Sequence, residues 1–165
     1  MYPETGATQR GPLPAGYRHL RYRTRVGAGD AAYARAVEAL FTWRMHAAMG
    51  VPVEASASRA APGVRVVARP GLGPLRMTAP CVVVWAERGA RRSGWGYGTV
   101  AGHPLRGEEA FVVTSDAGGA VWLEVVAFSR AARWWARLAG PLVPPFQRLY
   151  AYRCGAALRR LASAG

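Results

Sequence analysis

Residues 94–128 constrain the fold most, because their pattern predicts three consecutive antiparallel strands. In the first of these, Trp95, Tyr97 and Thr99 alternate with glycines, so one face carries large side chains and the other lets another group approach the backbone closely. The strands are expected at 94–99, 109–114 and 120–128, with turns at 102–107 and 115–119. The rest of the chain must supply what covers this sheet.

The flanking sequence predicts four further strands and three helices. The first alternating run places Arg21, Arg23 and Arg25 on one face, which is typical of a strand with a solvated basic face. The last helix has the clearest helical period and carries Pro144 and Pro145 in its first turn. The expected elements are, in order, a strand at 17–26, a helix at 31–49, strands at 53–57, 64–69 and 75–87, the three strands above, a helix capped by Ser129 that contains Trp134, Trp135 and Leu138, and a last helix whose stripe includes Phe146, Leu149, Tyr150, Arg153, Ala157, Leu158 and Leu161. This order predicts an α+β fold with an antiparallel sheet of about seven strands.

The length of 165 residues predicts a single domain over 1–165, with residues 1–16 as an extended N-terminal coil. No apolar run reaches the ~20 residues of a membrane span, and turn formers stand where a signal peptide would have its apolar region. Cys81 and Cys154 lie in apolar runs and are expected to be reduced and structural. We therefore expect a soluble, cytoplasmic protein.

The charge balance is strongly basic, since all 22 basic residues are arginine against nine acidic residues, for a net charge of +13. This charge predicts weak, salt-dependent binding of polyanions. It does not predict specific nucleic-acid recognition, because no nucleic-acid-binding motif is present. The three histidines lack metal-ligand spacing, and no P-loop, Rossmann or nucleophile-elbow pattern occurs, so neither a metal nor another cofactor is predicted.

Glu124 is the most anomalous acidic residue, because it shares a strand face with Trp122 and Phe128. If that face is the inner one, burial would raise the pKa of the Glu124 carboxyl. The alternatives are an ion pair with one of the arginines, or a register that exposes this face to solvent. Arg44 lies on the apolar stripe of the first helix. It would either form an ion pair with Glu124 or extend its side chain along the apolar surface so that the guanidinium reaches solvent at the edge of the helix.

His103 lies in a turn shortly before Glu108 and Glu109, so a histidine–carboxylate pair for proton transfer is geometrically possible. The alternative is structural: these side chains would cap backbone groups of a turn that Pro104 and its neighbouring glycines shape. The second interpretation is favoured, because caps and ion pairs also gather polar residues.

Short motifs along most of the chain carry a family resemblance. They are YPE at 2–4, GAT at 6–8, LPAGYRH at 13–19, WRMH at 43–46, LRMTAPC at 75–81, YGT at 97–99, GHP at 102–104 and GEEAF at 107–111. On these residues the chain resembles domain-of-unknown-function family 1990, which has no established activity. The element order resembles the helix-grip fold of the Bet v 1-like and START-like superfamily, in which a curved sheet wraps around a long C-terminal helix. That resemblance implies lipid, hormone or polyketide-like ligands and, in some members, cyclase or dehydratase chemistry.

We therefore expect an apolar or aromatic small molecule to bind in a cavity between the sheet and the last helix. The predicted ligand-binding residues are Arg44, Trp95, Tyr97, His103, Trp122, Glu124 and Tyr150. The first alternative is an acid/base enzyme of cyclase or dehydratase type that acts through Glu124 or His103. The second is a module that binds proteins or polyanions.

Overall fold

Seven strands form one antiparallel sheet in the computed structural model, which describes residues 2–71, 76–132 and 140–164. The order across the sheet is β1-β7-β6-β5-β4-β3-β2, so the first and the last strands of the sequence are neighbours. The strands are β1 (Arg18–Ala28), β2 (Val53–Ala55), β3 (Arg65–Ala68), β4 (Ala79–Glu87), β5 (Arg92–Thr99), β6 (Leu105–Ser115) and β7 (Ala120–Ala131). The helices are α1 (Ala7–Arg10), α2 (Asp30–Phe41), α3 (Arg44–Ala48) and α5 (Val143–Ser163). The predicted α+β helix-grip architecture is confirmed.

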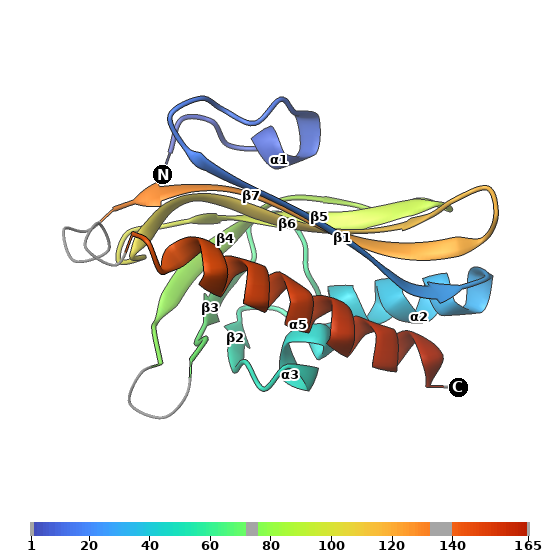
Figure 1. Cartoon of the computed structure of the whole chain (residues 1–165). Helices are drawn as coiled ribbons and strands as arrows, with labels where there is room; N and C mark the ends of the chain where they lie inside the picture. The colour runs from blue at the N-terminus through green and yellow to red at the C-terminus, as the bar shows by residue number, and fades with distance from the viewer. Residues whose placement is uncertain (1, 72–75, 133–139, 165) are drawn as a thin grey trace.

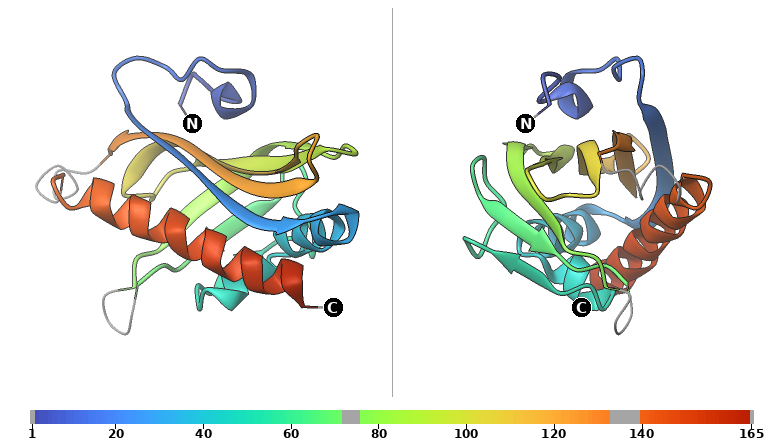
Figure 2. Two further views of the ribbon diagram at one scale, coloured as in Figure 1. Left: turned by 45° about the vertical axis from the view of Figure 1, so that its right-hand side comes forward. Right: turned by 90° about the vertical axis from the view of Figure 1, so that its left-hand side faces the viewer.

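The sheet separates two unequal layers. Figure 1 shows α2, α3 and α5 on one side of the sheet and the N-terminal segment with α1 on the other. The sheet curves around the side on which α5 lies (Figure 2), and we call this the inner face. None of the described helices is long and apolar enough to cross a membrane.

Helix α5 packs along the inner face through small residues. Its buried positions are Ala151, Cys154, Gly155, Ala157, Leu158 and Ala162. A side chain at Gly155 would collide with Thr24 of β1, so this glycine lets the helix lie close to the strand. The prediction that Leu149 belongs to the packed stripe is wrong, since this side chain is 57% exposed, whereas Leu158 is fully buried as predicted.

The first predicted helix is two helices in the structure. α2 ends at Phe41, and Trp43 adopts φ = 63°, a left-handed conformation that a helix cannot continue through. This conformation is accompanied by tertiary contacts of the indole, which donates to the carbonyl of Ala57 (3.0 Å) and packs on Trp95 (centroids 5.1 Å apart). Tertiary packing therefore ended a helix that the sequence period would have continued.

The end of β7 also differs from expectation. Ser129 lies inside β7, which runs to Ala131, so it does not cap a helix. Trp134, Trp135 and Leu138, which were expected in that helix, lie outside the described residues. The last helix begins at Val143 with its prolines in the first turn, as predicted.

Part of the outer face of the sheet is covered by the N-terminal segment, here defined as residues 2–10. The expected extended coil is interrupted here by α1 (Ala7–Arg10), and the segment packs on the sheet, since Tyr2 and Thr8 are only 2% and 8% exposed. A side chain at Gly96 would meet Trp85 and Thr8, and one at Gly98 would meet the Tyr2 ring. The prediction that the glycine face of this strand admits a close approach is confirmed, and the approaching group is the N-terminal segment.

Glu108 is the anchor of that segment. Its carboxylate, 3% exposed, accepts hydrogen bonds from the Tyr2 hydroxyl (2.5 Å), the amides of Gly6 (2.7 Å) and Thr8 (2.9 Å), and the Thr8 hydroxyl. The Trp85 indole donates to the Thr8 hydroxyl oxygen at 2.9 Å. These donors satisfy a charge that would otherwise be costly to bury.

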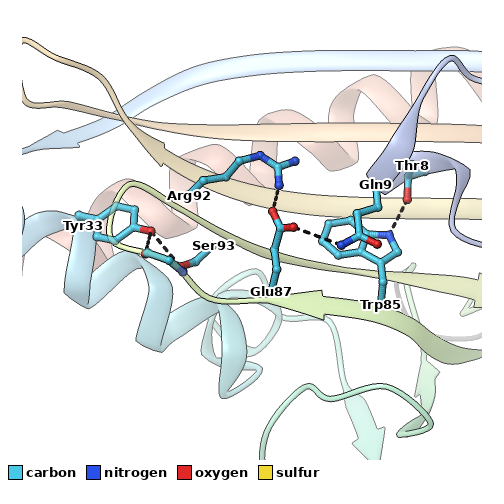
Figure 3. A network of polar contacts seen from close by, with 8 residues as sticks. Thr8, Gln9, Tyr33, Trp85, Glu87, Arg92 and Ser93 are labelled. Carbon is cyan, nitrogen blue, oxygen red and sulfur yellow. Dashed lines mark hydrogen bonds and ion pairs between the residues drawn. The ribbon is translucent and has the colours of Figure 1, made fainter.

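A second set of polar contacts involves side chains of β4 and β5 (Figure 3). The Gln9 amide donates to Glu87 Oε2 at 3.2 Å, and Arg92 forms an ion pair with Glu87. On the other side of the sheet, the Tyr33 hydroxyl of α2 lies 2.8 Å from Ser93 Oγ. Side-chain hydrogen bonds thus tie both layers to the same pair of strands.

Candidate functional site

A cavity of about 300 Å³ lies between the inner face of the sheet and the N-terminal half of α5. Its walls are mostly apolar. The apolar lining includes Val66, Ala68, Pro70, Met77, Ala79, Leu105, Ala127, Leu142, Val143 and Phe146. The polar side chains of the lining include Cys81, Tyr97, His103, Glu109, Gln147 and Tyr150. A largely apolar hollow with a few placed polar groups is typical of small-molecule sites.

Glu109 is the central polar group of the cavity. It lies directly across from Tyr97 in the antiparallel pairing of β5 and β6, so both side chains point to the inner face. The Tyr97 hydroxyl donates to Glu109 Oε2 at 2.8 Å. Burial raises the pKa of Glu109 to about 7, and the bond from Tyr97 only partly opposes this shift. The carboxyl can therefore take or give a proton near neutral pH.

Four further titratable side chains of the cavity, Cys81, Tyr97, His103 and Tyr150, are neutral near pH 7. Burial raises the pKa of the Cys81 thiol and of the Tyr97 and Tyr150 hydroxyls. Burial lowers the pKa of His103 to about 4, so its ring carries no charge. His103 Nδ1 lies 2.9 Å from both the amide and the carbonyl of Leu105, and it thus shapes its own turn.

An aromatic cluster lies next to the cavity. Trp95 packs against Tyr97, Phe111 and His46, with ring centroids 5.4, 5.1 and 5.9 Å away. The two ring nitrogens of His46 have no hydrogen-bond partner among the described residues, and burial lowers the pKa of this ring to about 4. His46 is therefore a neutral core residue.

Comparison with known proteins assigns the chain to a family. Residues 1–157 match the model of a domain of unknown function, DUF1990. The chain belongs to the DUF1990 family. A UPF0548 protein of Deinococcus radiodurans is 38% identical over 162 residues, covering 89% of this chain and 79% of that one. A UPF0548 protein of Arabidopsis thaliana is 31% identical over 136 residues, covering 78% of this chain and 65% of that one.

The fold is shared with solved structures of low sequence identity. Truncated norcoclaurine synthase from Thalictrum flavum superposes with a TM-score of 0.64 at 7% identity, covering 94% of this chain and 99% of that one. This DUF1990 protein therefore has a Bet v 1-like helix-grip fold. At a sequence identity this low, the similarity shows a shared fold and does not indicate a shared activity.

Three of the predicted binding residues of this DUF1990 protein lie at the cavity, and four do not. Tyr97, His103 and Tyr150 line it. Trp95 is fully buried behind Tyr97, and Arg44 is exposed on α3. The remaining two, Trp122 and Glu124, lie on the face of β7 that points away from the cavity.

Trp122 and Glu124 lie on the outer face of β7, so the expectation that this face lines a cavity is wrong. The buried inner positions of β7 are the alternate ones, such as Leu123 and Val125. Glu124 pairs with Arg23 Nε at 3.1 Å, and the Arg23 guanidinium lies 3.9 Å from the centre of the Trp122 ring system. Alternation along a strand assigns residues to two faces but does not say which face is inside.

Glu109 is the site residue that the sequence did not single out, although it was noted beside His103. A signal for it exists in the DUF1990 sequence. The glycine alternation places Tyr97 on the packed face, and the residue paired with Tyr97 across the hairpin must share that face. Among the described residues, no three His, Cys, Asp or Glu side chains come together to hold a metal ion.

The raised pKa of Glu109 predicts a pH-dependent stability. The unfolded chain releases this proton near 4.5 and the folded protein near 7, so the parent loses stability as the pH rises through this window. The glutamine of Glu109→Gln cannot ionise, so the variant does not lose stability in this way. The free energy of unfolding of Glu109→Gln minus that of the parent should therefore increase as the pH rises from 4.5 to 7. Urea unfolding of both proteins at a series of pH values measures this difference. The buried histidines are the same in both proteins, so their contribution to the pH dependence drops out of the difference. A difference that stays constant across the window would contradict the raised pKa.

Proposed function

We propose that this protein binds an apolar or aromatic small molecule in the cavity between the sheet and α5. The observation that carries the proposal is the apolar hollow of about 300 Å³ with Glu109 and Tyr97 joined by a hydrogen bond inside it. The volume is at the lower end of the ~300–1,000 Å³ typical of ligand pockets, which favours a ligand of one or two rings. A norcoclaurine synthase of similar fold, with a TM-score of 0.59, was solved with dopamine and hydroxybenzaldehyde, which are molecules of this size.

Native mass spectrometry of the protein purified from its own host tests this function. We expect a small apolar molecule to co-purify with the parent and to be lost from Ala68→Phe, which fills the cavity wall. Ala47→Phe is the matched control, because it adds the same group at an exposed position of α3. A parent that carries nothing and binds no member of an aromatic ligand panel would contradict the proposal, provided that thermal melting shows it folded.

Acid/base catalysis in the same cavity is the second candidate function. The pKa of Glu109 near 7 favours it, because a general acid or base works best when its pKa lies near the working pH. Glu124 cannot play this role from the outer face, and His103 is held by its own turn. Conversion of the co-purified molecule that is lost in Glu109→Gln, with binding retained, would support an enzyme of cyclase or dehydratase type. A molecule returned unchanged by the parent would support carriage.

Weak polyanion binding is proposed for the outer face. Arg21, Arg23 and Arg25 of β1 are exposed side by side there, although Glu124 partly neutralises the middle one. Such binding should disappear at physiological salt.

A further inference from the structure

The charges of this protein are distributed unevenly between its surface and its cavity. The chain has 22 arginines, yet none of those that the structure describes lines the cavity. Two of the nine acidic residues, Glu108 and Glu109, contribute to the lining, but only the Glu109 carboxyl points to the inner face, where the cavity lies. A basic protein thus encloses a hollow whose ionisable groups favour negative charge.

Only Glu109 is available to a ligand. The two oxygens of Glu108 are taken up by the N-terminal segment, through the donors of Tyr2, Gly6 and Thr8. Glu109 uses Oε2 for the bond from Tyr97, and no described residue donates to its Oε1. The cavity therefore offers one carboxylate with a free acceptor and no described arginine beside it.

We propose that the ligand is an apolar ring compound that carries a protonated amine, with the ammonium paired to Glu109; this inference rests on the proposed binding function. An anionic ligand would find no cation among the described residues of the lining and would lie beside a carboxylate, which is unfavourable in an apolar site. A neutral ligand would leave Glu109 protonated or unpaired. An ammonium group would form a charge-assisted hydrogen bond to Oε1.

The remaining groups around Glu109 do not compete for this role. Tyr97 faces it from β5, Cys81 from β4, and Tyr150 and Cys154 from α5, and burial raises the pKa of each of these groups above its usual value. His103, in the turn before β6, is neutral near pH 7. Affinity for an amine should therefore increase as the pH rises through about 7, where Glu109 ionises.

Three probes with one ring system test the ligand class. They are 1-naphthylmethylamine, 1-naphthalenemethanol and 1-naphthoic acid, titrated by calorimetry at pH 8 and physiological salt. We expect the amine to bind about tenfold or more tightly than the alcohol, the effect of one hydrogen bond to a charged group, and the acid to bind most weakly. The net charge of +13 attracts the acid and repels the amine at the surface, so this order cannot arise from non-specific binding.

Glu109→Gln should reduce the affinity for the amine about tenfold or more, so that the amine no longer binds more tightly than the alcohol. Glu124→Gln is the control, because it removes the same charge from the outer face and should preserve the order of the three probes. An amine preference that survives in Glu109→Gln, or an acid that binds as tightly as the amine, would overturn the inference while leaving the proposed function intact. If none of the three probes binds, both proposals fail.

Discussion

Leu158→Asp is expected to lower the free energy of unfolding by about 4 kcal/mol, because it places a carboxylate without a partner at a fully buried position of α5. Leu149→Asp makes the same chemical change nine positions earlier on the same helix, at a side chain that is 57% exposed. We expect this second variant to change stability by no more than about 0.5 kcal/mol. Urea unfolding of the two variants and the parent measures both values.

The two variants are informative together because they make the same chemical change on the same helix, so each serves as the control for the other. Both leucines were assigned to one stripe, but nine residues at 3.6 per turn are two and a half turns, so the two side chains point to opposite sides of the helix, in agreement with the buried Leu158 and the exposed Leu149. A loss for Leu149→Asp as large as that for Leu158→Asp would contradict this orientation of α5, since the two side chains lie on opposite sides of the helix. A small loss for Leu158→Asp would show that α5 does not pack on the sheet through this side chain.

Glu108→Gln is expected to cost about 3 kcal/mol and to release the N-terminal segment from the outer face. The carboxylate accepts from four donors of Tyr2, Gly6 and Thr8. An amide at this position has one acceptor oxygen, and its NH₂ group would face donors, so at least two buried donors lose their partner. Hydrogen exchange at the Gly6 and Thr8 amides, together with urea unfolding, measures the release and its cost.

Glu124→Gln is the matched control for this change, since it lies on the same face of the sheet one strand away. Its ion pair with Arg23 is partly exposed, and removing it should cost no more than about 1 kcal/mol. Protection of the Gly6 and Thr8 amides should be unaffected. If Glu108→Gln retained the parent's protection there, the N-terminal segment would be held by its apolar contacts and not by the carboxylate.

Much of the fold was predictable because local patterns and the tertiary structure agree. The strands of residues 94–128 alternate cleanly, and their turns contain the residues that turns require. The start of α5 was also predictable, since two consecutive prolines fit only the first turn of a helix. The break at Trp43 was not, because it depends on contacts with Ala57 and Trp95 that are distant in sequence.

The candidate site was predicted only in part. Tyr97 and Tyr150 line the cavity as expected, because an aromatic strand face opposite glycines and an amphipathic last helix indicate a shared interior. His103, which was chosen for the carboxylates that follow it in the sequence, also lines the cavity, and ligand binding by these three residues stays a prediction. Glu124 was preferred over Glu109 because its neighbours in sequence are large and apolar. In the structure those neighbours lie outward, where Arg23 covers Trp122.

The sequence by itself determined the order of the elements, the antiparallel pairing of neighbouring strands and the two faces of each strand, because all three follow from residue types at short separation. Only the tertiary structure decided which face is inside and which carboxylate serves which purpose. The adjacent residues Glu108 and Glu109 point to opposite faces of β6, so one anchors the N-terminal segment and the other enters the cavity. The physical reason is that burial is created by the segments that cover each face, and those segments lie about a hundred residues before Glu108 and several tens of residues after Glu109 in the chain.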